Sequence, residues 1–144
     1  MHVPVQVDYG VRALVDLAQH SDETVVRASE IARRQGIPEQ YLARVLHSLQ
    51  RHGLTKAQRG PLGGHSLARR PSEITMGAVM SYLGGPVALV ACLDDAGNCE
   101  QSSCCGQQSV WREAEAAMWK VLNATTIADV VERMPAPSQE KVPA

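Results

Sequence analysis

The stretch ASEIARRQGIPEQYLARVLHSLQRHG, residues 28–53, carries the pattern that decides the fold. Its first part, residues 28–35, predicts a short helix with Ile31 on its inner side. Gly36 follows, and glycine readily adopts the left-handed backbone conformation that ends a helix. Pro38 then suits the first turn of a second helix, because its φ is already helical and no N–H is needed there.

The second helix is expected to run to about His52, and Gly53 ends it. Two short helices joined by a tight glycine turn, with the small Ala32 where they cross, are typical of a helix-turn-helix. Two packed helices that bind no DNA would show the same pattern. The apolar stripe that predicts the buried side of the second helix is Leu42, Val45, Leu46 and Leu49.

A β-hairpin is predicted directly after these helices. The segment LTKAQRGPLGGHSLA, residues 54–68, contains two short strands around a Gly-Pro-Leu-Gly-Gly turn, with Lys56 and Arg59 on the first strand. A helix-turn-helix followed by a basic hairpin is a winged helix. In that arrangement the second helix enters the major groove of DNA, and the hairpin tip reaches a minor groove or the backbone.

Positive charge is concentrated in the same region. Residues 27–70 contain nine Lys or Arg and two acidic residues, although the whole chain has a formal net charge of −1. A basic block within a near-neutral chain indicates a localised surface for a polyanion such as DNA. The alternative interpretation is a solvated basic surface without a partner.

Helices are also predicted on both sides of the winged helix. Residues 7–21 have apolar side chains at helical spacing, and Thr75 is a suitable N-cap for a helix that reaches about Leu83. A long amphipathic helix is predicted in SVWREAEAAMWKVLNAT, residues 109–125. Its stripe is predicted to contact a second copy, because helix-turn-helix proteins usually bind DNA as dimers; packing on its own domain is the alternative. The stripe consists of Trp111, Ala114, Met118, Val121 and Leu122.

The expected fold is mainly α with a small β-hairpin wing. A chain of 144 residues with 44% hydrophobic residues can bury a core without disulfides. No signal peptide is visible, and the longest apolar run, residues 86–93, is too short to span a membrane, so we expect a cytoplasmic protein. The predicted organisation is a winged-helix DNA-binding domain (1–85), a cysteine-bearing loop (86–108), a dimerisation helix with a C-terminal segment (109–133) and a disordered tail (134–144).

All four cysteines lie within fourteen residues, at Cys92, Cys99, Cys104 and Cys105. A cytosolic protein uses clustered cysteines more often for metals or redox chemistry than for structural disulfides. No Cys-x2-Cys pair is present, which disfavours a zinc site without excluding it. The polar, glycine-containing loop can wrap a larger group, and an iron–sulfur cluster on three cysteines fits.

Together these stretches resemble the winged-helix iron–sulfur regulators, a family that includes IscR, NsrR and the iron-responsive repressors. The resemblance runs from about residue 3 to residue 132 and rests on DYGVRALVDLA, IARRQGIPEQYLARVLHSLQRHGL, RGPLGGHSLAR, EIT and the cysteine loop running into VWREAE. Family members carry three cluster cysteines, with five residues between the last two. The resemblance therefore implies that Cys92, Cys99 and Cys105 bind an iron–sulfur cluster and that Cys104 is spare.

The resemblance also bears on the fourth ligand of the cluster. IscR-like members with a [2Fe–2S] cluster have a histidine three residues after the last cysteine, where this chain has Gln108. In some nitric-oxide-sensing repressors an aspartate from the other subunit completes a [4Fe–4S] cluster, and Asp8 stands at the matching place. This implies Asp8 as a ligand, [4Fe–4S] rather than [2Fe–2S], and nitric oxide as the signal. The alternative is that Asp8 has only a structural role, because an acidic residue at the start of a helix stabilises the positive end of the helix dipole.

Family DNA contacts can be transferred in part. Arg44 stands where a glutamine is common and can pair with guanine or phosphate, and Arg59 matches a wing residue that enters the minor groove in relatives. Leu62, His65 and Ser66 depart from the usual wing sequence, so the tip is expected to differ. The predicted DNA-binding residues are Arg33, Pro38, Gln40, Tyr41, Arg44, Lys56, Arg59 and Gly60.

The sequence thus predicts a homodimeric transcriptional repressor that binds double-stranded DNA and whose DNA affinity depends on the state of its cluster. Two alternatives keep the same fold: a sensor of iron, cluster status or redox state, and a zinc- or thiol-based regulator with Cys104 and Cys105 as the redox pair. A third is a small electron carrier or enzyme. It would leave the basic winged helix unexplained, and the sequence contains no nucleophile–base constellation and no phosphate-binding loop.

Overall fold

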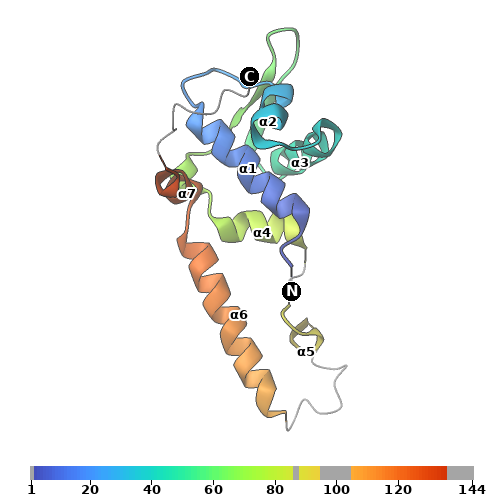
Figure 1. Ribbon diagram of the computed structural model, residues 1–144, viewed down its shortest axis with the longest axis vertical. Coiled ribbons are helices and arrows are strands. Elements are labelled where there is room, and N and C mark those ends of the chain that lie inside the picture. The colour runs from blue at the N-terminus through green and yellow to red at the C-terminus, as the bar shows by residue number, and fades with distance from the viewer. Residues whose placement is uncertain (1, 86–87, 95–104, 136–144) are drawn as a thin grey trace.

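The helix-turn-helix and the wing are both present in the computed structural model, which describes residues 2–85, 88–94 and 105–135 (Figure 1). The predicted fold, mainly helical with a two-stranded antiparallel hairpin, is confirmed. No helix in the described part of the chain has the length and apolar character needed to cross a membrane. The elements are α1 (Val5–Gln19), α2 (Ala28–Gln35), α3 (Glu39–Arg51), β1 (Thr55–Gln58), β2 (Gly64–Leu67), η1 (Pro71–Glu73), α4 (Met76–Gly84), α5 (Ala91–Asp94), α6 (Gly106–Ala124) and α7 (Ile127–Arg133).

Helix α1 is central to the hydrophobic core, because it contacts α2, α3, α4 and α7. Leu14 of α1 is fully buried, as are Leu46 of α3, Val79 of α4 and Ile127 of α7. Full burial of one such side chain stabilises the fold by about 1.5–3 kcal/mol. The stripe predicted for the second helix of the helix-turn-helix is confirmed, since all four of its residues are buried.

The turn between α2 and α3 has the expected left-handed glycine. Gly36 has φ 64°, and the N–H of Ile37 donates to the carbonyl of Ala32 at 3.0 Å. Pro38 differs from the prediction, because it precedes α3 as its N-cap with ψ 128° and the helix begins at Glu39. Its carbonyl accepts the first intrahelical bond, from the N–H of Leu42 at 2.9 Å.

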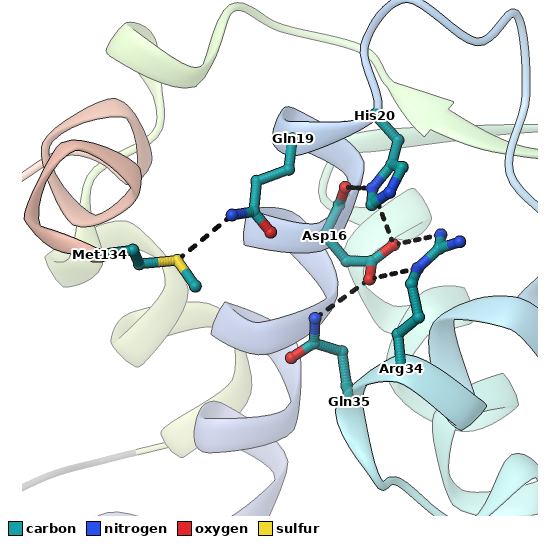
Figure 2. A network of polar contacts seen from close by, with 6 residues as sticks. All are labelled: Asp16, Gln19, His20, Arg34, Gln35 and Met134. Atoms are coloured by element: carbon teal, nitrogen blue, oxygen red, sulfur yellow. Dashed lines mark hydrogen bonds and ion pairs between the residues drawn. The ribbon is translucent and has the colours of Figure 1, made fainter. Parts of the chain in front are cut away.

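A buried ion pair fixes α2 against α1 (Figure 2). Asp16 of α1 is 0% exposed, and its carboxylate accepts hydrogen bonds from Arg34 Nη2 at 2.8 Å and Arg34 Nε at 3.0 Å. Gln35 Nε2 donates to the same carboxylate at 3.0 Å, and His20 Nδ1 lies 3.6 Å away. Burial alone would raise the pKa of Asp16, but the bonds from Arg34 and Gln35 and the charge of Arg34 outweigh it and lower that pKa.

The wing is anchored to the segment that precedes α2. Strands β1 and β2 pair antiparallel, from Thr55 opposite Leu67 to Gln58 opposite Gly64. Val26 then extends the hairpin as a one-residue bridge, since it exchanges two backbone hydrogen bonds with His65 at 2.8 and 2.7 Å. This bridge sets the position of the hairpin relative to the helix-turn-helix.

Replacing Gly64 with alanine is expected to lower the free energy of unfolding by roughly 1–3 kcal/mol, because the new Cβ would lie 2.6 Å from the carbonyl oxygen of Val26. Backbone atoms cannot move aside without breaking the Val26–His65 bridge. Urea unfolding of the two proteins measures the difference. Gly106→Ala is the matched control, since nothing lies within 4 Å of the position that a Cβ would take there. Equal midpoints for the two variants would contradict the close approach at Gly64.

Helix α7 packs against α1, whereas α6 joins the core at its C-terminal end only. The N–H of Ile127 donates to the carbonyl of Ile74 at 2.8 Å, and the N–H of Met76 donates to that of Thr125 at 2.8 Å. These bonds hold the start of α7 and the end of α6 against η1 and α4. The rest of α6 extends away from the body, towards α5 (Figure 1).

Several details differ from the sequence-based expectations. Arg59 follows β1 rather than lying on it, because the backbone turns at Gly60 with φ 105°. Helix α6 begins at Gly106, earlier than the stripe indicated, and α7 is a separate helix because Thr126 starts it as an N-cap. Cys92 lies in the short helix α5 rather than in a loop. Residues 136–144, most of the predicted disordered tail, lie outside the described residues.

Candidate nucleic-acid interface and cysteine site

The exposed surface of the helix-turn-helix carries four of the eight residues predicted to contact DNA. Pro38, Gln40 and Arg44 are exposed at the start and along the outer side of α3, and Arg33 is exposed on α2. Because Leu42, Leu46 and Leu49 face the core, the opposite side of α3 is free to enter a groove. The buried apolar stripe of α3 therefore sets which side of that helix faces outward.

Tyr41 differs from the other predicted contacts, because it is only half exposed. Its ring packs edge-on against Tyr9 of α1, with ring centroids 5.3 Å apart and planes at 84°. Arg12 lies over the other ring of this pair, 5.8 Å from the Tyr9 centroid. The ring of Tyr41 thus packs α3 against α1.

The wing presents Lys56, Arg59 and Gly60, all exposed. A third basic residue beside the wing, Arg27, was missing from the predicted DNA-binding residues. Its Nη2 donates to the carbonyl of Pro61 at 2.9 Å, so it joins the N-terminus of α2 to the wing tip. No motif marks this contact, because it links residues 34 positions apart through the fold alone.

His65 lies on β2 opposite Ala57 and forms the bridge to Val26. It is half-buried, and burial lowers the pKa of His65. Its Nδ1 is buried and has no hydrogen-bond partner among the described residues. The positive charge of the wing therefore comes from Lys56 and Arg59 rather than from His65.

Two of the three predicted cluster cysteines lie in the described part of the chain. Cys92 is in α5 and Cys105 is the N-cap of α6, and both are partly exposed free thiols. Helix α5 contacts α6, and the N–H of Leu89 donates to Glu115 Oε2 at 3.2 Å. Cys99 and Cys104 lie outside the described residues, so only the sequence bears on their roles.

Asp8 lies in the first turn of α1 and is connected to the helix-turn-helix. Its carboxylate accepts hydrogen bonds from Arg12 Nη2 at 2.9 Å and Arg12 Nε at 3.2 Å. Arg12 Nη1 also donates to the carbonyl of Gln35, the last residue of α2, at 3.2 Å. No three His, Cys, Asp or Glu of the described residues could hold a metal ion together, so Asp8 does not join Cys92 and Cys105 within one copy.

An apolar hollow of about 510 Å³ surrounds Asp8. Its exposed members include Val3, at 57% relative exposure, and Val5, at 46%. The residues that line the hollow are Val3, Val5, Val7, Asp8, Val11 and Met76.

The stripe predicted for dimerisation divides into two parts. Leu122 is half-buried and packs against the core, together with Trp119, and Met118 is also half-buried. Trp111 at 39% and Val121 at 62% remain exposed, as does Ala114. The C-terminal end of α6 therefore packs partly on its own domain, and the remaining apolar side chains are available to a partner.

Comparison with known proteins agrees with this architecture. Residues 4–133 match the Rrf2 family, described as iron-dependent transcriptional regulators. Protein rrf2 of Nitratidesulfovibrio vulgaris is 34% identical over 131 residues, which cover 91% of this chain and 87% of that protein. The prediction that the chain is not an enzyme is confirmed by this family of regulators.

Two solved structures extend the similarity to three dimensions. IscR of T. potens has a TM-score of 0.75 and 32% sequence identity, covering 94% of this chain and 93% of that one. CymR of B. subtilis, a global cysteine regulator, has a TM-score of 0.79 and 27% identity, covering 94% and 99%. With its helix-turn-helix, its wing and a match over nearly the whole sequence, the chain belongs to the Rrf2 family of winged-helix transcriptional regulators.

Proposed function

We propose that this regulator is a homodimeric repressor that senses nitric oxide through an iron–sulfur cluster held by Cys92, Cys99, Cys105 and Asp8 of a second copy. The observation that carries the proposal is the position of Asp8. Its carboxylate lies in an exposed apolar hollow and contacts the helix-turn-helix through Arg12, and among the described residues it forms no metal-binding group with Cys92 and Cys105 of its own chain.

The donor groups suit such a cluster. Cysteine thiolates are the usual ligands of iron–sulfur clusters. Cys92 and Cys105 are free thiols on two helices that contact each other, and the N-terminus of α6 at Cys105 favours negatively charged ligands. When bound, the cluster supplies iron that nitric oxide or oxidants can attack. Three thiolates and one carboxylate favour [4Fe–4S] over [2Fe–2S] in this proposal.

The proposed dimer follows from two exposed apolar surfaces. One is the hollow around Val3 and Val5. The other is on α6, where Val110 is 60% exposed, Trp111 39% and Val121 62%. An isologous dimer would bury both surfaces twice, once for each copy. In this arrangement Asp8 lies at the interface, where a partner's cysteine loop can use it.

A route from the cluster ligand to DNA exists in the hydrogen bonds of Arg12. If Asp8 held iron, its carboxylate would have less negative charge to offer Arg12, and the contact between Asp8 and Arg12 would weaken. Arg12 also donates to Gln35 at the end of α2, and the position of α2 therefore depends on what Asp8 binds. An exposed pair of this kind contributes about 0–1 kcal/mol, enough for a modest change in DNA affinity.

A second route passes through α4. Helix α6 contacts α4, and α4 contacts α3, where the rings of Tyr82 and His52 stack with centroids 4.4 Å apart. A displacement of the cysteine segment at the start of α6 would therefore reach the end of the recognition helix. Allosteric coupling of this kind requires only a difference of a few kcal/mol between two states.

Members of this family act on DNA, and we propose that α3 reads the major groove. Arg44 is the residue placed to pair with guanine, while Arg33, Lys56 and Arg59 contact phosphates or the minor groove. Pro38, Gln40, Tyr41 and Gly60 complete the proposed interface.

Anaerobically purified protein is expected to be brown, to contain iron and to bind an operator selected from random DNA. Nitric oxide should bleach the visible absorption and weaken operator binding in parallel, because cluster state sets DNA affinity in this proposal. Visible absorption, circular dichroism and fluorescence anisotropy on the same samples measure both changes. Several structured bands at longer wavelength would instead indicate [2Fe–2S] and remove Asp8 from the ligand set.

Two other outcomes would redirect the proposal. If iron chelation or oxidants release DNA while nitric oxide does not, the regulator senses iron, cluster status or redox state. If the protein is colourless and contains zinc or a reversible disulfide, the thiols act without a cluster. The similarity to CymR, a cysteine regulator, is the observation that favours this thiol-based function as the second candidate.

A further inference from the structure

The tip of the wing is narrow and carries an exposed apolar side chain. Of the five residues 60–64, three are glycine, so Pro61 and Leu62 supply the only side chains there. Leu62 is 81% exposed, which makes it the most exposed large hydrophobic side chain among the described residues. Leu62 is also one of the positions at which this chain departs from the usual wing sequence of the family.

The turn that presents Leu62 is held by several independent features. The N–H of Gly63 donates to the carbonyl of Gly60 at 2.9 Å, which closes a β-turn with Pro61 and Leu62 at its two corner positions. Proline favours the first of these positions, because its φ is already correct. Arg27 Nη2 holds the carbonyl of Pro61 from outside the hairpin at 2.9 Å. The turn that presents Leu62 is therefore pre-organised.

The two glycines that follow Leu62 have no room for a side chain. A Cβ at Gly63 would overlap the carbonyl oxygen of Gln58, and one at Gly64 would lie 2.6 Å from that of Val26. Both obstacles are backbone atoms, which cannot turn aside. The tip thus stays thin enough for the minor groove of DNA, which is about 6 Å wide.

Basic residues lie on the hairpin and at its tip. Arg59 and Lys56 are exposed on the hairpin, and Arg27 contacts the turn itself. In Figure 1 the hairpin projects at the same end of the molecule as α2 and α3, away from the free end of α6. The hairpin thus combines an exposed apolar tip with basic residues, one of which, Arg27, contacts the turn. DNA matches this combination, because its phosphates are negatively charged and its stacked bases are apolar.

We propose that Leu62 inserts into the minor groove as a wedge between two base pairs and bends the operator. This inference rests on the proposed DNA interface and adds a deformation to it. Apolar wedges of this type unstack one step and bend the duplex by roughly 20–90° towards the major groove. Since pyrimidine–purine steps unstack most easily, the operator is expected to prefer TA or CA/TG at the position under the wing.

The test compares three variants on an operator selected by the wild-type protein from random DNA, labelled at both ends for energy transfer. Leu62→Ala is expected to lose most of the bend and to bind about tenfold more weakly, with an unchanged dependence of affinity on salt, because no charge is lost. Leu62→Met should retain the bend. Arg59→Ala should instead lower the salt dependence by about one counterion, as expected when one cationic contact with DNA is lost.

Each other outcome overturns a defined part of the inference. If Leu62→Ala binds and bends the operator like the wild type, the wedge is wrong while the DNA interface stands. If the wild type selects no DNA at all, the proposed interface fails and the wedge fails with it. If Leu62→Ala leaves DNA bending intact but dissociates an oligomer in light scattering, Leu62 contacts another copy of the chain.

Discussion

Asp16→Asn is expected to lower the free energy of unfolding of the apoprotein by about 3 kcal/mol, the lower end of what removal of one partner from a buried ion pair costs. Asp16 is fully buried, and the substitution leaves the guanidinium of Arg34, only 23% exposed, without its counter-charge. For a chain of this size the melting temperature should fall by roughly 10 °C. Urea and thermal unfolding, followed by far-ultraviolet circular dichroism, measure both quantities.

Asp8→Asn is the matched control, because Asp8 also lies on α1 and also pairs with an arginine. Its side chain is 47% exposed and that of Arg12 is 44% exposed, so solvent screens the pair. The apoprotein variant is expected to lose less than about 1 kcal/mol. Equal losses for the two variants would contradict the distinction between the buried and the exposed pair.

The ion pair at Asp16 also predicts a pH dependence. The pKa of Asp16 is lowered in the folded state, so folding favours the ionised carboxylate. Its contribution is therefore fully present above the ordinary carboxyl value of about 4 and is lost as the pH falls through the lower folded pKa. The stability difference between wild type and Asp16→Asn should be constant near neutral pH and should shrink below about pH 4.

The sequence predicted the elements whose signals are local. The glycine at position 36, the stripe of α3 and the turn of residues 60–64 each act within a few residues, and all three were found as expected. The Asp16–Arg34 pair and the Val26–His65 bridge were not predicted. Both depend on how α1, α2 and the wing approach one another, and neither residue type nor spacing carries that information.

The candidate site divides in the same way. Exposure of Arg33, Arg44 and Lys56 follows from the apolar stripes of their neighbours, so the basic surface was predictable. The contact between Arg27 and Pro61 was not, since it crosses between two elements. Likewise, one amphipathic stripe on α6 cannot show which of its residues face the chain's own core. In the structure Met118 and Leu122 are half-buried, whereas Val121 between them is exposed.

Cys99→Ala is expected to abolish the visible absorption and the bound iron, whereas Cys104→Ala should retain both. The prediction rests on the spacing of five residues between the last two cluster cysteines of the family, which selects Cys99 and Cys105. Losing one of three thiolates leaves too few soft ligands to hold a cluster. Iron analysis and visible circular dichroism of anaerobically purified variants, with operator binding on the same samples, give the comparison.

The two variants form a strict pair, since each removes one sulfur atom from the same short segment and leaves the described helices unchanged. If Cys104→Ala is colourless and Cys105→Ala is brown, Cys104 is the third ligand, and the cluster is then not held by the N-cap of α6. The path from the cluster through α6 to α4 would lose its first contact. The path through Asp8 and Arg12 would remain, because it enters the helix-turn-helix at Gln35 and does not involve α6. The choice between neighbouring cysteines therefore decides which route a signal can take to the recognition helix.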